Sequence, residues 1–196
     1  MPELLSFRRE LYRKYFHLTS SLFGLSILYF GKETMMPFMV VGGVIIPILD
    51  YGRQRFHFMQ KLFFYLFDLF IRPNEKKDIT GATYVFISAA IVVVFFDKIP
   101  AATGLLFMSI GDSFAAIFGQ KYGYTKIGDK SLEGTLAFII SCVIVAMFIP
   151  GLNLYTGIVA IIISSYVELF SGKKLSDNLL IPIVAAMIIQ FVGGSR

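Results

Sequence analysis

Seven apolar runs, separated by short polar stretches, dominate the pattern of hydrophobic and polar positions along the chain. They lie at roughly 16–30, 35–49, 80–96, 100–118, 132–149, 154–170 and 178–194. Continuous apolar runs of this length predict membrane-embedded helices rather than half-buried strands. Several are shorter than the ~20 residues that cross a full bilayer, so they need flanking residues or locally thinned lipid. The pattern predicts an all-α, polytopic membrane helix bundle of about seven transmembrane helices.

The longest connection, residues 50–79, predicts one further helix of a different kind. Residues 56–71 mix Phe, Leu and Tyr with His57, Lys61 and Asp68, which is typical of a helix lying in the membrane interface. Pro73 is expected to end it and to begin a polar loop, 72–78. Because no soluble domain or tandem repeat interrupts the pattern, we expect a single integral-membrane domain, 1–196.

Composition and charge agree with a membrane protein and add an orientation. The hydrophobic fraction of 56% and the mean hydropathy of +0.72 exceed the usual values of soluble domains. All but Lys32, Lys98 and Arg196 of the 18 lysines and arginines precede the first run or lie in alternate connections. This bias predicts a cytoplasmic N-terminus. The net charge of +5 therefore reflects the orientation of the chain in the membrane, and we expect no nucleic-acid partner.

Carboxylates at the ends of the apolar runs gather on the predicted cytoplasmic side. An ionised group inside such a run costs at least a few kcal/mol unless it has a partner. Asp112 is the clearest case, and on this ground its replacement by Asn is expected to leave stability unchanged or higher. Asp50 and Arg53, one helical turn apart, could simply pair with each other. The candidate functional carboxylates are Asp112, Glu133, Glu168 and Asp177.

A strip of small residues follows Asp112. Ala115, Gly119 and Gly123 recur every four positions, which places them on one helix face. Such a strip lets a backbone or a phosphate approach closely. Three lysines come next, Lys121, Lys126 and Lys130. Carboxylates with lysines suit a magnesium-bound polyphosphate, since Mg²⁺ takes one or two carboxylates plus substrate phosphates. No P-loop, zinc motif or Gly-x-Ser-x-Gly elbow points to other chemistry.

Four blocks of sequence carry a resemblance to a known family. They are Arg13-Lys14-x-x-His17, Thr80-Gly81-Ala82, Gly111-Asp112-Ser113 with its continuation to Lys130-Ser131-Leu132-Glu133-Gly134, and Asp177-Asn178-x-x-Ile181-Pro182. In this order they resemble the CTP-dependent polyprenol kinase family, which includes dolichol kinase, phytol kinase and CTP-dependent diacylglycerol kinase. The resemblance spans nearly the whole chain.

The resemblance implies transfer of the γ-phosphoryl group of CTP to the hydroxyl of a membrane lipid alcohol. We expect an isoprenoid alcohol (dolichol, another polyprenol, phytol or geranylgeraniol) in preference to diacylglycerol. Nucleotidyl transfer of the phosphatidate cytidylyltransferase type is the alternative, although the Gly-His-Gly-Gly segment of those enzymes is absent after Glu133. A non-catalytic transporter or scaffold is a second alternative, but transporters place polar groups near the bilayer midplane.

Each candidate residue receives an expected role in this reaction. Asp112 is the leading Mg²⁺ ligand, with Glu133 and Asp177 as further ligands. Lys130 holds the β- or γ-phosphate, and either Glu168 or Asp177 accepts the proton of the alcohol. The residues expected to contact the nucleotide or the metal are Arg13, Lys14, His17, Ser113, Gly119, Lys121, Gly123, Lys126, Ser131, Gly134 and Asn178, and Asn178 is expected to orient either the metal or the alcohol. The active site is expected to face the cytoplasm.

Overall fold

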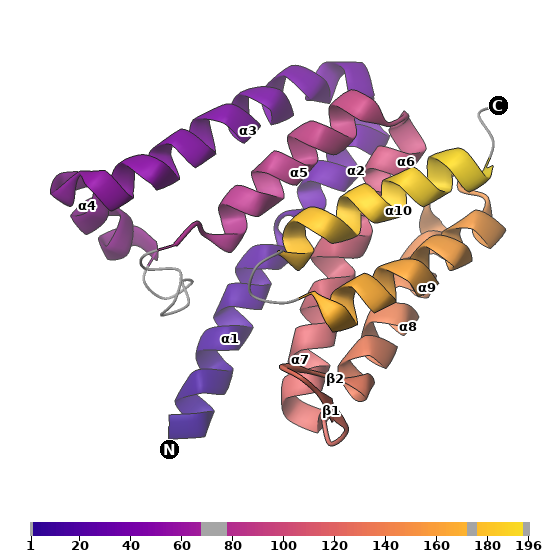
Figure 1. Ribbon diagram of the computed structural model, residues 1–196. Coiled ribbons are helices and arrows are strands. Elements are labelled where there is room, and N and C mark those ends of the chain that lie inside the picture. The colour runs from indigo at the N-terminus through magenta and orange to yellow at the C-terminus, as the bar shows by residue number, and fades with distance from the viewer. Residues whose placement is uncertain (1, 68–77, 172–175, 194–196) are drawn as a thin grey trace.

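The computed structural model is almost entirely helical and describes residues 2–67, 78–171 and 176–193 (Figure 1). The all-α prediction is confirmed. The helices are α1 (Pro2–Leu18), α2 (Ser21–Phe30), α3 (Lys32–Arg55), α4 (His57–Phe67), α5 (Gly81–Phe95), α6 (Lys98–Leu106), the π-helical segment η3 (Phe107–Gly111), α7 (Asp112–Tyr122), α8 (Leu132–Phe148), α9 (Leu154–Phe170) and α10 (Asp177–Gly193). Strands β1 (Lys126–Ile127) and β2 (Lys130–Ser131) form a short antiparallel hairpin.

Helices α5, α8, α9 and α10 follow the predicted apolar runs closely because polar residues mark where they begin. The side chain of Thr80 accepts a hydrogen bond from the Thr83 amide at the start of α5. Ser131 caps α8 in the same way, and Asn153 caps α9. These side chains satisfy amides that have no partner within the helix. The local sequence therefore determines both the type and the start of these elements.

The first apolar run does not form one helix, and this prediction is wrong. Helix α1 continues to Leu18, a turn follows at Thr19 and Ser20, and α2 begins at Ser21. The hydroxyl of Thr19 donates to the Phe16 carbonyl, and that of Ser20 donates to the His17 carbonyl, both at 2.6 Å. Hydroxyls that bond nearby carbonyls offer the backbone an alternative to a continuous helix. The break lets α1 run at its own angle along α7 (Figure 1).

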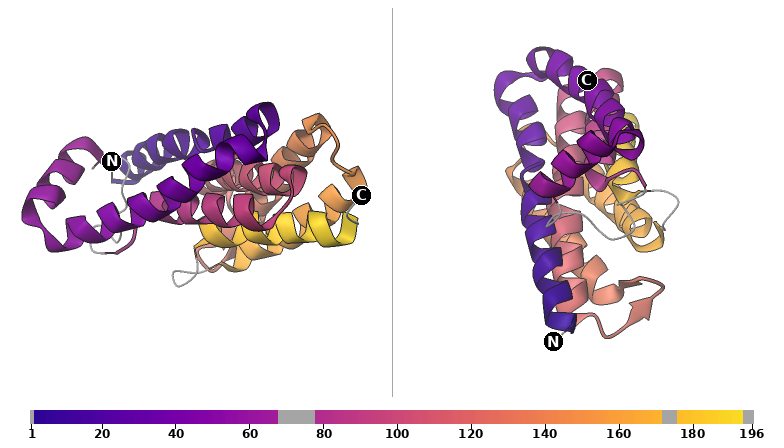
Figure 2. Two further views of the ribbon diagram at one scale, coloured as in Figure 1. Left: turned by 90° about the horizontal axis from the view of Figure 1, so that it is seen from above. Right: turned by 90° about the vertical axis from the view of Figure 1, so that its left-hand side faces the viewer.

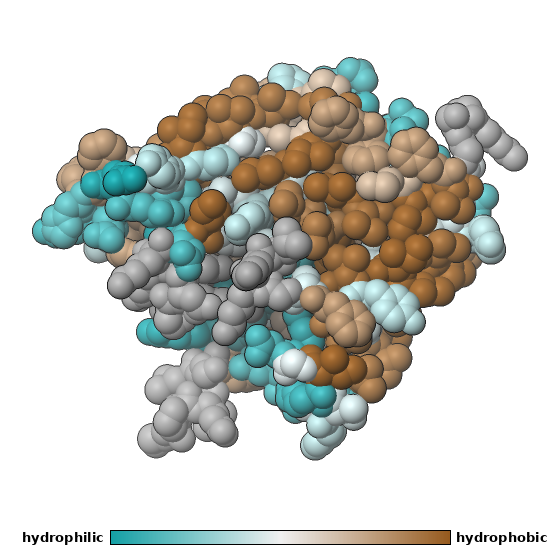
Figure 3. Space-filling model, in the orientation of Figure 1, coloured by the Kyte–Doolittle hydropathy of each residue, from teal (hydrophilic) through white to brown (hydrophobic). Residues whose placement is uncertain are grey.

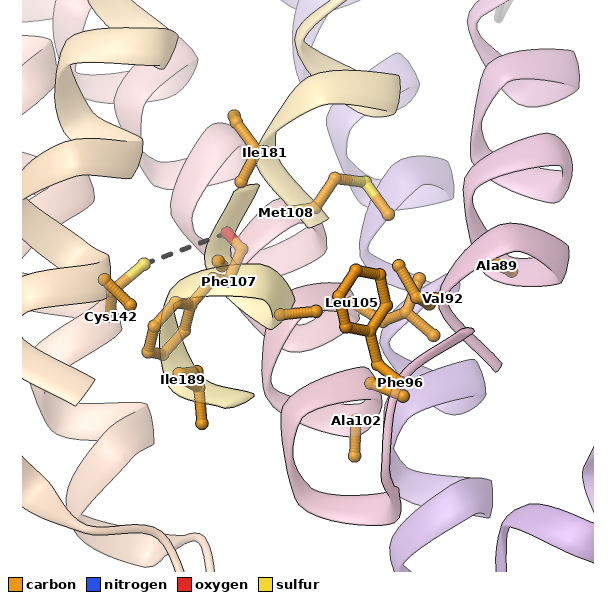
Figure 4. Packing of buried hydrophobic residues seen from close by; sticks show 14 of the residues in the cluster. Ala89, Val92, Phe96, Ala102, Leu105, Phe107, Met108, Cys142, Ile181 and Ile189 are labelled. Carbon is orange, nitrogen blue, oxygen red and sulfur yellow. Dashed lines mark hydrogen bonds between the residues drawn. The ribbon is translucent and has the colours of Figure 1, made fainter. Parts of the chain in front are cut away.

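The centre of the bundle is the continuous helical unit formed by α6, η3 and α7. It packs against α2, α8 and α10, while α5 and α9 pack on α10 and α3 packs on α5. Its side chains form the middle of the hydrophobic core (Figure 4), with Leu105, Phe107 and Met108 inaccessible to solvent. The thiol of Cys142 on α8 lies 3.8 Å from the Phe107 carbonyl. Helix α4 packs chiefly on α3 at the edge of the bundle (Figure 2).

The surface is consistent with a membrane helical bundle. Hydrophobic residues cover the face made by α3, α5, α9 and α10, and hydrophilic residues gather beside the hairpin and α1 (Figure 3). Two described helical stretches, Lys32–Arg55 and Lys98–Tyr122, are long and apolar enough to cross a membrane. Helices α5, α8, α9 and α10 are apolar but shorter. The number of spans and the cytoplasmic N-terminus stay predictions.

The predicted interfacial segment begins as a helix. Helix α4 covers His57–Phe67 and has no buried side chain, while residues 68–71, with Asp68, lie outside the described residues. The polar loop at 72–77, with Pro73, and the basic pair Lys173 and Lys174 also lie outside them. The placement of α4 in the membrane interface stays a prediction.

A buried carboxylate ties α3 to α5. Asp50 pairs with Arg53 as the sequence suggested, but it also accepts hydrogen bonds from the Thr80 amide at 2.8 Å and from the Thr83 hydroxyl at 2.6 Å. Arg53 in turn donates to the Asp78 carbonyl at 2.6 Å and lies over the Phe63 ring of α4. The pair is therefore part of a buried network that holds the start of α5 against α3.

Replacing Asp50 by Ala is expected to lower the free energy of unfolding by about 3–5 kcal/mol, because it removes a buried carboxylate that pairs with Arg53 and accepts hydrogen bonds from Thr80 and Thr83. Glu33→Ala, at an exposed position on the same helix, is the matched control and should change stability by less than about 0.5 kcal/mol. Thermal unfolding of both variants in detergent measures the difference. Equal melting temperatures for the two variants would contradict a stabilising role for the network.

Candidate active site

Asp112 lies at the point where the π-helical segment passes into α7, and its side chain is buried. Only 3% of the residue is exposed. Its Oδ2 atom forms an ion pair with the Nζ of Lys14, and His17 Nε2 lies 3.4 Å from the same oxygen. The spacing of three puts Lys14 and His17 on one face of α1, which packs along α7. The N-terminal basic block and the Asp112 block therefore meet, although they are far apart in the sequence.

Lys130 on β2 forms the second half of the site. Its Nζ donates to Glu168 Oε1 at 2.8 Å and to Asp177 Oδ2 at 3.0 Å. Burial lowers the pKa of Lys130, but the negative charges of Asp177, Asp112 and Glu168 outweigh it and hold that pKa above its usual value. The ammonium group is therefore charged throughout the neutral range. It bridges the end of α9 and the start of α10.

The two halves form one electrostatic site. The charge of Lys130 interacts with Asp112, and the charge of Lys14 interacts with Asp177. We refer to Lys14, His17, Asp112, Lys130, Glu168 and Asp177 as the charged cluster. Three carboxylates and two ammonium groups leave it with a formal charge of −1 when His17 is neutral. A bare polyphosphate would gain little from such a site, so a bound anion needs an accompanying cation.

The glycine strip is filled by protein. A Cβ atom on Gly119 would lie 2.9 Å from Ser131 Oγ, and one on Gly123 would lie 2.1 Å from the Gly119 carbonyl oxygen. A Cβ on Gly134 would lie 2.7 Å from the Ala115 carbonyl oxygen. These glycines let α7, α8 and the hairpin pack closely, and the flat surface that the sequence suggested for a phosphate is occupied by Ser131 and Gly134. The close packing holds Lys130 against the end of α9.

The remaining predicted residues lie around the charged cluster rather than in it. Glu133, in the first turn of α8, accepts hydrogen bonds from the Thr125 amide at 3.0 and 3.3 Å, so the structure does not bring it to Asp112. Ser113 donates to the Ser109 carbonyl. Arg13 pairs with Glu10, Lys121 lies over the Tyr122 ring, and Lys126 donates to the Gly119 carbonyl.

Two contacts of the site did not follow from the sequence. The hydroxyl of Thr135 lies 3.0 Å from Glu168 Oε2, opposite the oxygen that Lys130 contacts. Thr135 lies one helical turn after Ser131, the capping residue of α8, and this spacing is the signal that could have indicated it. The amide nitrogen of Asn178 donates to the Gly81 carbonyl at 3.3 Å, which joins the Asp-Asn and Thr-Gly-Ala blocks.

Comparisons with known proteins find several lipid kinases among the relatives of this chain. The chain is 26% identical to the CTP-dependent diacylglycerol kinase 1 of Schizosaccharomyces pombe, and the match covers 94% of each chain. It is 36% identical to the dolichol kinase of Saccharomyces cerevisiae over 40% of this chain and 17% of that protein. It is 31% identical to the phytol kinase of Synechocystis over 45% of this chain and 42% of that protein.

Relatives named CTP-dependent diacylglycerol kinase, dolichol kinase and phytol kinase, at modest identity, support a relationship of this chain to the CTP-dependent lipid kinases. The assignment rests on relatives named diacylglycerol, dolichol and phytol kinase rather than on a family model or a fold match. No family model matches the chain, and no solved structure matches it. In this chain, residues of the four sequence blocks meet at or beside the charged cluster.

Proposed function

We propose that the protein transfers the γ-phosphoryl group of CTP to the hydroxyl of a membrane lipid alcohol, at the charged cluster. The observation that carries the proposal is the position of Lys130, whose ammonium group lies between Glu168 and Asp177 and within electrostatic reach of Asp112. Phosphoryl transfer passes through a loose transition state, so the protein mainly positions the reactants and neutralises charge. A partly buried cation beside several carboxylates suits both tasks.

The residues present fit a divalent cation that arrives with the nucleotide. Among the described residues, no group of three or more His, Cys, Asp or Glu side chains is placed to hold a metal ion alone. Mg²⁺ usually takes only one or two carboxylates and completes its shell with phosphates and water. Asp112 and Asp177 are the side chains we propose to hold it, and Glu133 is less suited because it bonds the Thr125 amide. Bound there, Mg²⁺ would neutralise phosphate charge.

In the proposed reaction the alcohol oxygen forms a bond to the γ-phosphorus, and the bond from that phosphorus to the β,γ-bridging oxygen breaks. CDP leaves, and the product is the lipid phosphate. Lys130 holds the transferred group through its ammonium hydrogens. The proton of the alcohol passes to the carboxylate of Asp177 or Glu168. We further propose a multi-pass protein whose charged cluster faces the cytoplasm, in line with the distribution of basic residues.

An isoprenoid alcohol is our proposed acceptor, since the segments of highest identity belong to relatives named dolichol kinase and phytol kinase. Diacylglycerol is the competing acceptor, because the match over the whole chain is to relatives named diacylglycerol kinase. The test supplies purified protein with Mg²⁺, a panel of these alcohols and CTP labelled at the γ-phosphorus. Labelled lipid phosphate is expected. Formation of labelled CDP-diacylglycerol from added phosphatidate and α-labelled CTP, with no labelled lipid phosphate, would indicate nucleotidyl transfer and overturn the proposal.

A further inference from the structure

Asn178, the second residue of α10, has one half of its amide bonded and the other half unsatisfied. The residue is 5% exposed. Its Nδ2 donates to the Gly81 carbonyl at 3.3 Å, while its Oδ1 is buried without a hydrogen-bond partner among the described residues. A buried acceptor left unsatisfied is costly, and groups of this kind in native structures call for an explanation.

The orientation of this amide is determined by its surroundings. A carbonyl oxygen can only accept, so the nitrogen of Asn178 must face Gly81 and the oxygen must face the other way. Gly81 is itself held in place, because Asp50 binds the amide of Thr80 and the hydroxyl of Thr83 at the start of α5. The Oδ1 atom of Asn178 therefore has a fixed direction before any ligand binds.

Asn178, which carries the unsatisfied oxygen, directly follows a member of the charged cluster in α10. The neighbouring residue, Asp177, contacts the Lys130 ammonium at 3.0 Å, and its Oδ1 accepts the Asn178 backbone amide. The hydroxyl that receives a phosphoryl group must lie close to the residue that holds that group. The base and sugar of a nucleotide lie farther away, across the triphosphate.

Chemistry narrows the ligand that Asn178 can bind. Its Oδ1 atom needs a hydrogen-bond donor, and ionised phosphates have none. The hydroxyl of a lipid alcohol is a donor, and the residues that follow in α10, Leu179 to Ile181, are apolar. An alcohol whose chain lies along these apolar residues would bring a donor to this end of α10 while the chain stays in apolar surroundings.

We propose that Asn178 Oδ1 accepts the hydrogen bond of the acceptor alcohol and selects for a free hydroxyl. This inference rests on the proposed function and deepens it. The bond is a ground-state contact. As the oxygen bonds to phosphorus, its proton passes to the neighbouring carboxylate, since proton loss can come late in a loose transition state. Loss of the contact should therefore weaken binding of the alcohol more than it slows the chemical step.

Kinetics of Asn178→Ala test whether the contact acts on binding of the alcohol rather than on the chemical step. The KM for the lipid alcohol is expected to rise about tenfold, which corresponds to ~1.4 kcal/mol, while kcat and the KM for CTP change less than twofold. Gln190→Ala is the matched control, because it removes an amide at the far end of the same helix, where Gln190 Oε1 accepts the Asp97 amide at 2.8 Å. A rise in the KM for CTP, or in the Mg²⁺ requirement, with an unchanged KM for the alcohol would overturn the inference.

A binding measurement tests directly whether the hydroxyl hydrogen of the alcohol is needed, and it requires no turnover of substrate. The wild-type protein should be stabilised against thermal unfolding more by geranylgeraniol than by its methyl ether, which has no hydroxyl hydrogen. The same two ligands are compared with the variants Asn178→Ala and Asn178→Ser. The alanine variant is expected to be stabilised equally by both ligands, and the serine variant to keep part of the preference for the free alcohol. Equal stabilisation of the wild type by both ligands would contradict the inference. Absence of labelled lipid with every alcohol would instead contradict the proposed function.

Discussion

Asp112→Asn is expected to reduce CTP-dependent phosphoryl transfer by about 100-fold or more, the usual cost of removing one electrostatic contact to the reacting group. The substitution keeps the shape of the side chain but removes the charge that would hold the cation. Incorporation of γ-label into lipid measures the effect. Asp97→Asn, at an exposed position before the other end of the same helical unit, is the control and should retain full activity. Loss of less than tenfold, ~1.4 kcal/mol, would exclude Asp112 as a principal ligand.

The same variant is expected to be less stable than the wild type. From the sequence, neutralising a lone carboxylate in an apolar run should leave stability unchanged or higher, but the structure pairs Asp112 with a Lys14 that is only 2% exposed. Breaking a buried ion pair on one side costs about 3–5 kcal/mol, because an uncompensated charge remains.

A double-mutant cycle separates the two effects. Asp112→Asn combined with Lys14→Met removes both charges, so melting temperature in detergent should recover most of what either single variant loses. Activity should not recover, since the carboxylate is still missing. A double variant no more stable than the single ones would show that the pair does not stabilise the fold.

Lys130→Gln is expected to lower activity by a similar factor, about 100-fold or more. It removes the cation that contacts Glu168 and Asp177 and leaves their negative charges facing the incoming phosphate. Lys130→Arg keeps the charge and should retain more activity than Gln, although a guanidinium does not reproduce the compact ammonium. The phosphoryl-transfer assay compares the variants, with the exposed Lys98→Gln as control.

The raised pKa of Lys130 also predicts how activity should depend on pH. Because that pKa lies above its ordinary value of 10.5, the stabilisation from this ammonium is fully present below pH 10.5 and is lost only as the pH rises through the higher folded-state value. Lys130 should therefore add no step to the pH–activity profile at neutral pH. A neutral-pH step that disappears in Lys130→Arg would contradict this assignment.

The sequence was sufficient for most helices because their signals are local. The run 154–170 matches α9 in both bounds, and 132–149 matches α8 within one residue. Capping residues and the ends of apolar stretches lie within a few positions of the boundaries that they define. The break at Thr19 and Ser20 was missed because serine and threonine hydroxyls are also tolerated inside helices, and only the bonds they form decide between the two outcomes.

The candidate residues followed from the sequence more readily than their partners did. Carboxylates inside apolar runs stand out because they are costly there, so Asp112 and Glu168 could be selected one at a time. Which cation neutralises each carboxylate depends on chain segments 98 and 38 residues away, and no local pattern encodes that distance. The same limit explains why the glycine strip left a backbone and a phosphate as alternative neighbours, whereas the structure places Ser131 and Gly134 against it.

The sequence by itself determined an apolar, all-helical chain with its polar groups at the helix ends, and it carries the four blocks that resemble CTP-dependent lipid kinases. These properties depend on residue type and short-range spacing. The tertiary structure decided that Lys14 faces Asp112, that Lys130 lies between Glu168 and Asp177, and that Asn178 turns its oxygen away from Gly81. These contacts arise from the packing of helices distant in sequence, because burial leaves each charged group only the partners that the neighbouring helices bring to it.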